Sequence, residues 1–180
     1  MLLDGRHVYT TVDGQRNLSP RPGVHGKGEW ESTSVILAGQ RFTITAIPAK
    51  HVRGGQCLGF VIECESLART GDLPNAVYFT GDTVLTEELL KIKEKWHISI
   101  MLVSLGNAHV PGPEGLLQVT MGARDASLLA HKLDADTVTP QHFDSWAHFT
   151  ESSAEARRIW EEMGLLTFKF CTPGILTRLS

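Results

Sequence analysis

The run ISIMLVSL, residues 98–105, restricts the possible folds more than any other part of this sequence. Its apolar side chains follow one another almost without polar breaks, which is typical of a strand that is buried on both faces of a sheet. A strand of this kind needs a covering layer on each side. The sequence therefore favours a layered α/β domain built around a central sheet.

Strand patterns precede this run, and helical patterns alternate with strands after it. A capping box of Ser152 and Glu155 marks the start of the last helix. We expect strands at 41–49, 58–66, 76–80, 98–105, 136–140, 165–170 and 174–179, and helices at 86–96, 122–133 and 152–164. Near the N-terminus, a short strand should run into an Asp-Gly turn, followed by a loop over residues 12–30. This order predicts one domain over residues 1–180, with helices on the outer face of a mixed sheet.

Charge and composition narrow the choice of partners. The net charge is −3, without a basic block, which argues against nucleic acid or an anionic membrane surface. No run approaches the ~20 apolar residues that a membrane span needs, and the N-terminus has no signal-peptide pattern. The cysteines Cys57, Cys64 and Cys171 form no Cys-x-x-Cys pair, so we interpret them as reduced thiols of a cytoplasmic protein. The expected partner is a small-molecule substrate, and the oligomeric state is left open.

Three of the expected strands are each followed by a side chain that can bind a metal. His51 follows the strand that stops at Pro48, Asp82 follows the run VYFTG, and His142 follows the strand that stops at Pro140. Strand ends at one edge of a sheet lie near one another, so the loops that leave them can bring ligands together. Imidazole and carboxylate groups are the ligands of Zn²⁺, Mn²⁺ or Fe²⁺ in hydrolytic sites.

Each of these residues also has a purely structural interpretation. A histidine after a strand is more often a hydrogen-bonded surface residue than a ligand. Asp82 can cap the helix that follows it or form an Asx-turn, and His142 can pack beside Phe143 and Trp146. The residues by themselves leave both interpretations open.

The sequence from Trp30 onward resembles the metallo-β-lactamase superfamily, in particular the lactonase-like branch that includes ascorbate-6-phosphate lactonase-type proteins. The segments FTITAIPAKH, VYFTGDT, VTMGARDA and TPQHFDSWAHF carry this resemblance. It implies an αββα sandwich of which this chain holds the C-terminal two-thirds, without the first strands. It also implies a metal-dependent hydrolase, in which a metal-bound hydroxide attacks a lactone, ester, amide or phosphoester.

The resemblance assigns roles to the three candidate ligands. His51 would bind the first metal, Asp82 would bridge both metals and act as the catalytic residue that orients the nucleophile, and His142 would bind the second metal. The cofactor would be a divalent metal, zinc first and Mn²⁺ or Fe²⁺ otherwise, with two ions in the complete site. Further residues expected to line the substrate pocket are Trp146, His148, Asn107 and His109, with packing in the core as the alternative for Trp146 and His148. The histidines interpreted as incidental are His7, His25, His97 and His131.

One part of the family pattern has no counterpart in this chain. The H-x-H-x-D-H cluster that follows an early strand in this family occurs nowhere in the sequence. We therefore expect a chain that begins after this cluster, leaves two ligands for each metal, and exposes apolar surface on the strands at 42–47 and 58–64. As an isolated chain it should not turn over a substrate. One alternative is a truncated, non-catalytic remnant that retains the fold. Another is a phosphodiesterase that acts on nucleic acid or phospholipid, although the acidic net charge argues against such substrates.

Overall fold

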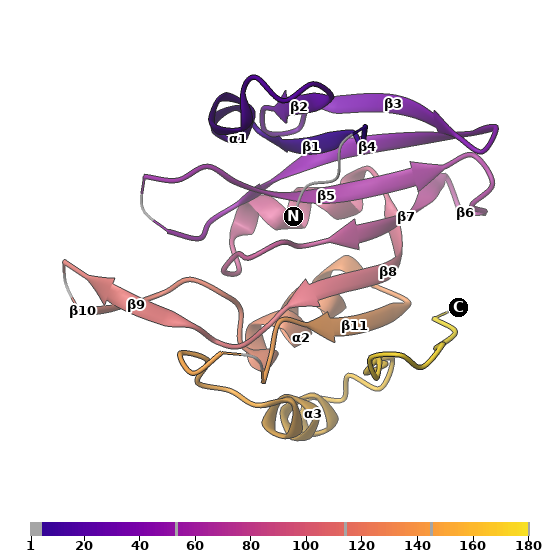
Figure 1. Ribbon diagram of the computed structural model, residues 1–180. Helices are drawn as coiled ribbons and strands as arrows, with labels where there is room; N and C mark the ends of the chain where they lie inside the picture. Colours follow the sequence, from indigo (N-terminus) through magenta and orange to yellow (C-terminus); the bar gives the residue numbers. More distant parts are fainter. Residues whose placement is uncertain (1–4, 53, 114, 145, 180) are drawn as a thin grey trace.

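The computed structural model describes residues 5–179 except 53, 114 and 145, and it shows a mixed sheet with helices on one face (Figure 1). The strands of this sheet are β3 (Ser32–Leu37), β4 (Gln40–Ala49), β5 (Cys57–Cys64), β6 (Arg69–Thr70), β7 (Leu73–Phe79), β8 (His97–Ser104) and β11 (Thr137–Gln141). Within the described residues they make a seven-stranded sheet in the order β11-β8-β7-β5-β4-β3, with β6 paired to β7. The helices are α1 (Val12–Leu18), η1 (Glu87–Glu94), α2 (Ala123–Leu133) and α3 (Ser153–Glu162).

The strand directions bring the ends of four strands to one edge of the sheet. β7, β8 and β11 pair in parallel. β5 runs antiparallel to both β4 and β7, so these two strands also share a direction. The carboxyl ends of β4, β7, β8 and β11 therefore lie at the same edge. The β4–β5 connection and a hairpin of β9 (His109–Gly112) and β10 (Gly115–Gln118) also project from it, on the left of Figure 1.

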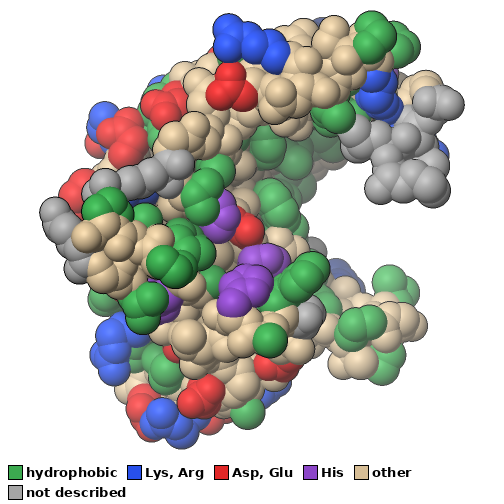
Figure 2. Space-filling view, turned by 60° about the vertical axis from the view of Figure 1, so that its left-hand side comes forward, with side chains coloured by type: hydrophobic (Ala, Val, Ile, Leu, Met, Phe, Trp, Pro, Cys, Tyr) green, Lys and Arg blue, Asp and Glu red, His purple; other side chains and the backbone are tan. Residues whose placement is uncertain are grey.

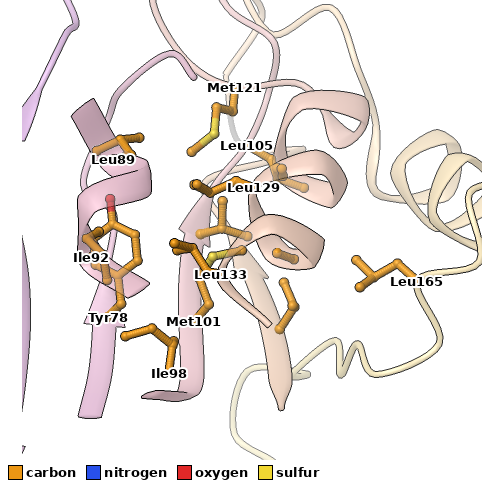
Figure 3. Packing of buried hydrophobic residues seen from close by; sticks show 14 of the residues in the cluster. Tyr78, Leu89, Ile92, Ile98, Met101, Leu105, Met121, Leu129, Leu133 and Leu165 are labelled. Atoms are coloured by element: carbon orange, nitrogen blue, oxygen red, sulfur yellow. The ribbon is translucent and has the colours of Figure 1, made fainter. Parts of the chain in front are cut away.

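The helix-covered face of the sheet forms the hydrophobic core. Alternate strand residues such as Tyr78 and Met101 are fully buried, in one cluster with Leu89 of η1 and Leu129 of α2 (Figure 3). Trp160 joins α3 to α2, because its indole N–H donates a 2.7 Å hydrogen bond to the first carbonyl of α2.

The opposite face of the sheet is apolar but only partly covered. Its half-buried residues are Ile44, Phe60, Ile62, Val77, Phe79, Ile100 and Leu102. Full burial of residues 98–105 is therefore confirmed on the helix face only. Within this sheet, the large hydrophobic side chains with the greatest exposure belong to the edge strand β3, where Ile36 is 69% and Leu37 is 58% exposed, rather than to the strands at 42–47 and 58–64.

The expectation of a loop over residues 12–30 is wrong. β1 (Val8–Thr11) leads directly into the helix α1 (Val12–Leu18), and β2 (Val24–Lys27) pairs in parallel with β1. The Asp-Gly pair lies inside the helix, because the Thr11 hydroxyl accepts a backbone N–H of the first turn at 2.9 Å and caps it. A local cap thus outweighs the turn preference of Asp-Gly.

The expected terminal strands at 165–170 and 174–179 are also wrong. Phe168 forms an isolated bridge with β11, and no regular strand occurs in this part of the described chain. The rings of Phe168 and Phe170 instead pack on Trp160, with centroids 5.3 and 5.8 Å away. Their apolar pattern reflects burial against α3 rather than strand pairing.

The three expected helices are present. The helix expected at 86–96 is a 3₁₀ helix over Glu87–Glu94. The capping box of Ser152 and Glu155 is confirmed, with both of its reciprocal hydrogen bonds formed. Among the described residues, none of the helices has the length and apolar character needed to cross a membrane. The strands β3, β6, β9 and β10 were not expected from the sequence.

A pair of tryptophan substitutions tests the role of α3 in the core. Trp160→Phe removes a buried hydrogen bond and part of a fully buried ring, so we expect the free energy of unfolding to fall by roughly 2 kcal/mol. Trp146→Phe is the matched control, because Trp146 is 62% exposed, and it should change the stability by less than about 0.5 kcal/mol. Urea unfolding measures both. Equal losses would contradict this account of the core.

Candidate functional site

The three candidate ligands follow strands that end at the shared edge of the sheet. His51 comes just after β4, Asp82 just after β7, and His142 directly after β11. The sheet therefore brings to one edge residues that are far apart in the sequence. The space-filling view is turned toward this edge of the sheet, and it shows histidine side chains gathered beside an acidic side chain (Figure 2).

A close backbone contact positions Asp82. Gly81 has φ of +60°, and a Cβ at this position would lie 2.8 Å from the carbonyl oxygen of Leu58. A Cβ on Gly59 would lie 2.6 Å from the carbonyl oxygen of Thr80. Glycine at both positions lets the end of β7 lie directly against β5. The glycine in VYFTGDT thus sets the path of the chain from which Asp82 projects.

The segment after Asp82 is bonded to the segment before His51. The buried hydroxyl of Thr83 accepts the backbone N–H of Lys50 at 2.9 Å. The N–H of Val84 donates to the Lys50 carbonyl, also at 2.9 Å. These two bonds hold the β4 and β7 ends side by side, so Asp82 and His51 belong to one rigid unit.

The ring of His51 is oriented by a backbone carbonyl. Its Nδ1 lies 2.7 Å from the carbonyl oxygen of Val119, at the base of the β9–β10 hairpin. A carbonyl can only accept, so Nδ1 carries a proton, and in the neutral ring Nε2 then has the lone pair. This is the arrangement found in metal-binding histidines, in which the second ring nitrogen donates to a carbonyl or carboxylate.

His142 faces Asp82. Its Nε2 lies 3.6 Å from Oδ2 of Asp82, and both side chains are about one-third exposed. Its other ring nitrogen, Nδ1, is buried and has no hydrogen-bond partner among the residues that the structure describes. Nitrogen and oxygen ligands about 2.0–2.2 Å from one tetrahedral zinc lie about 3.3–3.6 Å apart. The observed separation is too long for a good hydrogen bond and fits two ligands of one metal.

Asp82 and His51 also line the same cavity, which has a volume of about 330 Å³. Its other walls are formed by Tyr9, Thr10, Thr11, Gln56, Cys57, Leu58 and Phe60. Burial raises the pKa of the Cys57 thiol, and the neighbouring Asp82 carboxylate raises it further. The sequence interpretation gave Cys57 and the β1 residues no place in this site. Cys57 was interpreted only as a reduced thiol, and the short strand expected at β1 had no predicted neighbour, because its partner β2 lies within the expected loop.

The donor set suits a divalent metal but does not complete a site. One carboxylate and two imidazoles are ordinary ligands of Zn²⁺, Mn²⁺ or Fe²⁺. Among the described residues, however, no group of three or more His, Cys, Asp or Glu side chains is arranged to hold an ion. His142 is not among the residues that line the cavity of His51 and Asp82. The assignment of the three residues as ligands therefore stays a prediction.

The residues predicted to line a substrate pocket lie at the same edge, Asn107 in the loop after β8, His109 at the start of β9, and Trp146 and His148 in the loop after β11. Trp146 is 62% exposed, and its ring is 6.2 Å from that of His148. The Asn107 carbonyl accepts from the Thr150 hydroxyl at 2.6 Å and from His109 Nδ1 at 2.8 Å. None of the four predicted residues is among the described lining of the cavity, so their role also stays a prediction.

The histidines interpreted as incidental have structural partners. His97 Nε2 lies 2.9 Å from the Asp136 carboxylate, and His131 Nδ1 donates to a carbonyl within its own helix at 2.9 Å. His7 and His25 stack on each other, with ring nitrogens 2.7 Å apart. These contacts lie outside the cavity of Asp82.

Comparisons with known proteins show what the sequence and the fold of this chain are similar to. No family model matches the chain. A protein of Methanoculleus marisnigri described as a UPF0173 metal-dependent hydrolase is 25% identical over 151 residues, which cover 78% of this chain and 58% of the relative. The chain thus spans little more than half of that relative's length.

Solved structures show the same fold. The metallo hydrolase Igni18 of Ignicoccus hospitalis superposes with a TM-score of 0.70 at 21% identity, covering 95% of this chain and 67% of that one. The metallo-β-lactamase fold protein YhfI of Bacillus subtilis superposes with a TM-score of 0.61 at 15% identity, covering 96% of this chain and 66% of that one. The chain has the metallo-β-lactamase fold, and its sequence is similar to those of metal-dependent hydrolases.

Two glycine substitutions test the backbone contact that positions Asp82. Gly81→Ala places a Cβ 2.8 Å from the Leu58 carbonyl at φ +60°, whereas Gly71→Ala meets no atom within 4 Å at φ +59°. Both variants carry the strain of a left-handed alanine, about 1–2 kcal/mol. Gly81→Ala should lose about 1–3 kcal/mol more, because the backbone has to shift. Urea unfolding measures the difference, and equal losses would show that the contact is not tight.

Proposed function

We propose that this chain carries part of the metal centre of a metal-dependent hydrolase that acts on a small molecule. The observation that carries the proposal is the 3.6 Å approach of His142 Nε2 to the Asp82 carboxylate, which also shares a cavity with His51. The similarity to metal-dependent hydrolases supports the same function.

The proposed ligands are Nε2 of His51, the carboxylate of Asp82 and Nε2 of His142. His51 would help to hold one ion and His142 a second, and Asp82 would be a ligand that both ions share. Zinc suits this set best, with Mn²⁺ or Fe²⁺ as alternatives. A bound divalent metal supplies Lewis acidity, which lowers the pKa of a water molecule to about 7 and polarises the bond to be cleaved.

The chain's own residues orient the reactants. The Asp82 carboxylate holds the attacking water by a hydrogen bond and accepts its proton. The Val119 carbonyl keeps Nδ1 of His51 protonated, so that Nε2 remains a ligand. Leu58 and Phe60 give the cavity wall an apolar part that displaces water, and the hydroxyls of Thr10 and Thr11 are hydrogen-bond partners for a polar substrate group.

The substrate is proposed to be a lactone, ester, amide or phosphoester of a small molecule, with lactones first because of the lactonase-like segments. Trp146, His148, Asn107 and His109 are proposed to contact the part of the substrate that lies outside the cavity. The charge of −3 favours neither nucleic acid nor an anionic membrane as partner. A cytoplasmic location stays part of the proposal.

Metal titration of the 180-residue chain tests the ligand assignment. We expect Zn²⁺ to bind, and Asp82→Asn and His142→Ala to weaken binding at least about tenfold, because each variant removes a ligand. His97→Ala is the control, since His97 bonds to Asp136 instead, and it should leave the affinity unchanged. Isothermal titration calorimetry gives the constants. Binding that is equal in all four proteins would refute the assignment.

A second candidate, a non-catalytic chain that retains the fold, is favoured by one observation. The described residues contain no group of three or more ligands arranged for a metal, whereas a catalytic zinc normally has about three protein ligands. With two ligands for each ion, we expect no measurable hydrolysis of a lactone panel by this chain alone, even with Zn²⁺ or Mn²⁺ added. Metal-dependent turnover by the 180-residue chain would show that other side chains complete the centre, His109 and His148 first among them.

A further inference from the structure

His142 holds a conformation that its own polar contacts do not explain. Its backbone lies in the left-handed region, with φ of +59°, where a non-glycine residue needs support from its surroundings. Its Nδ1 has no hydrogen-bond partner among the described residues, and its Nε2 is 3.6 Å from Asp82, beyond a good hydrogen bond. The orientation of the ring therefore depends on packing.

The packing partner is Phe149. The two ring centroids lie 4.7 Å apart, and the ring planes are tilted by 58°, which is a favourable aromatic arrangement. On its other side, Phe149 meets the ring of His148, with a centroid distance of 4.8 Å.

Gly106 makes room for this arrangement. A Cβ at Gly106 would lie 2.8 and 2.9 Å from two ring carbons of Phe149, and 3.1 Å from the carbonyl oxygen of His142. Gly106 has φ of +97° and follows the end of β8. The phenyl ring therefore lies directly on the backbone beyond β8, in a place that no other residue type leaves open.

Phe149 is itself held in place by hydrogen bonds of its neighbours. The N–H of Thr150 donates to the Gly106 carbonyl at 3.0 Å, and the Thr150 hydroxyl donates to the Asn107 carbonyl at 2.6 Å. The Glu151 carboxylate accepts the first N–H of α2 at 2.6 Å. The segment that carries Phe149 is thus bound to the loop after β8 and to α2, both of which rest on the core.

We propose that Phe149 is a positioning residue for His142: seated on Gly106, its ring holds the imidazole with Nε2 directed at Asp82. The inference deepens the proposed function, since a histidine fixed in this way is ready to share a metal with Asp82 without a loss of side-chain freedom on binding. Phe149 itself touches neither metal nor substrate.

The test compares the His142 ring in metal-free variants and then measures their affinity for Zn²⁺. In Phe149→Ala and in Gly106→Ala we expect the His142 imidazole resonances, read by long-range ¹H–¹⁵N NMR, to shift and broaden, and the Zn²⁺ affinity to fall about tenfold. Phe149→Leu keeps part of the contact and should lie between these variants and the parent chain. Phe168→Ala is the control, because the ring of Phe168 packs on Trp160 and Phe170 rather than on His142 or its neighbour Phe143, and it should leave the resonances and the affinity unchanged.

The His142 resonances test the role of Phe149, and the Zn²⁺ affinity of the parent chain tests the proposed function, so the two can fail independently. A parent chain that does not bind Zn²⁺ refutes the metal centre, while the NMR comparison still decides the role of Phe149. Unchanged His142 resonances in folded Phe149→Ala overturn the inference. If Phe149→Ala does not fold, Phe149→Leu decides: shifted His142 resonances support the positioning role, and unshifted ones overturn it. A change of equal size in Phe168→Ala would also overturn it, since the effect would then be one of general stability.

Discussion

The close approach of the backbone at Gly59 and Gly81 is the contact on which the candidate site depends. Without a side chain at either position, the end of β7 lies directly against β5. A Cβ on Gly59 would lie 2.6 Å from the carbonyl oxygen of Thr80, and a Cβ on Gly81 would lie 2.8 Å from that of Leu58. Asp82 projects from this point. The hydrogen bonds of Thr83 and Val84 to Lys50 then join it to the chain that leads to His51. A change in this contact would therefore move two of the three candidate ligands together.

Each candidate ligand is oriented by a group that is not a ligand itself. The path of the backbone at Gly81 directs Asp82, the Val119 carbonyl orients the ring of His51, and the ring of Phe149 packs against His142. The three supports come from β5, from the base of the β9–β10 hairpin and from the loop after β11. Such outer contacts hold ligands in place before a metal arrives, which lowers the entropy lost on binding. The side chains of the three candidate ligands are thus positioned by contacts with the rest of the fold.

The sequence predicts the strand ends and the helices better than the loops. His51, Asp82 and His142 were expected at one edge because strand patterns and their endings are local signals, and the fold places all three there. Residues 12–30 were misjudged because the cap at Thr11 and the pairing of β1 with β2 outweigh glycine and proline content. Gly106 and Phe149 carry no local signal, since the need for glycine at 106 arises only when a ring from 43 residues further along the chain packs on it. Tertiary contacts of this kind decide the site, and a single sequence does not display them.

Anomalous diffraction from crystals of this chain soaked in Zn²⁺ decides whether Asp82 and His142 share a metal. We expect a zinc peak about 2.0–2.2 Å from both Oδ2 of Asp82 and Nε2 of His142, two atoms that are 3.6 Å apart. A second, weaker peak is expected between Asp82 and His51. Zinc bound at other residues, such as the stacked pair of His7 and His25, with none beside Asp82, would contradict the account.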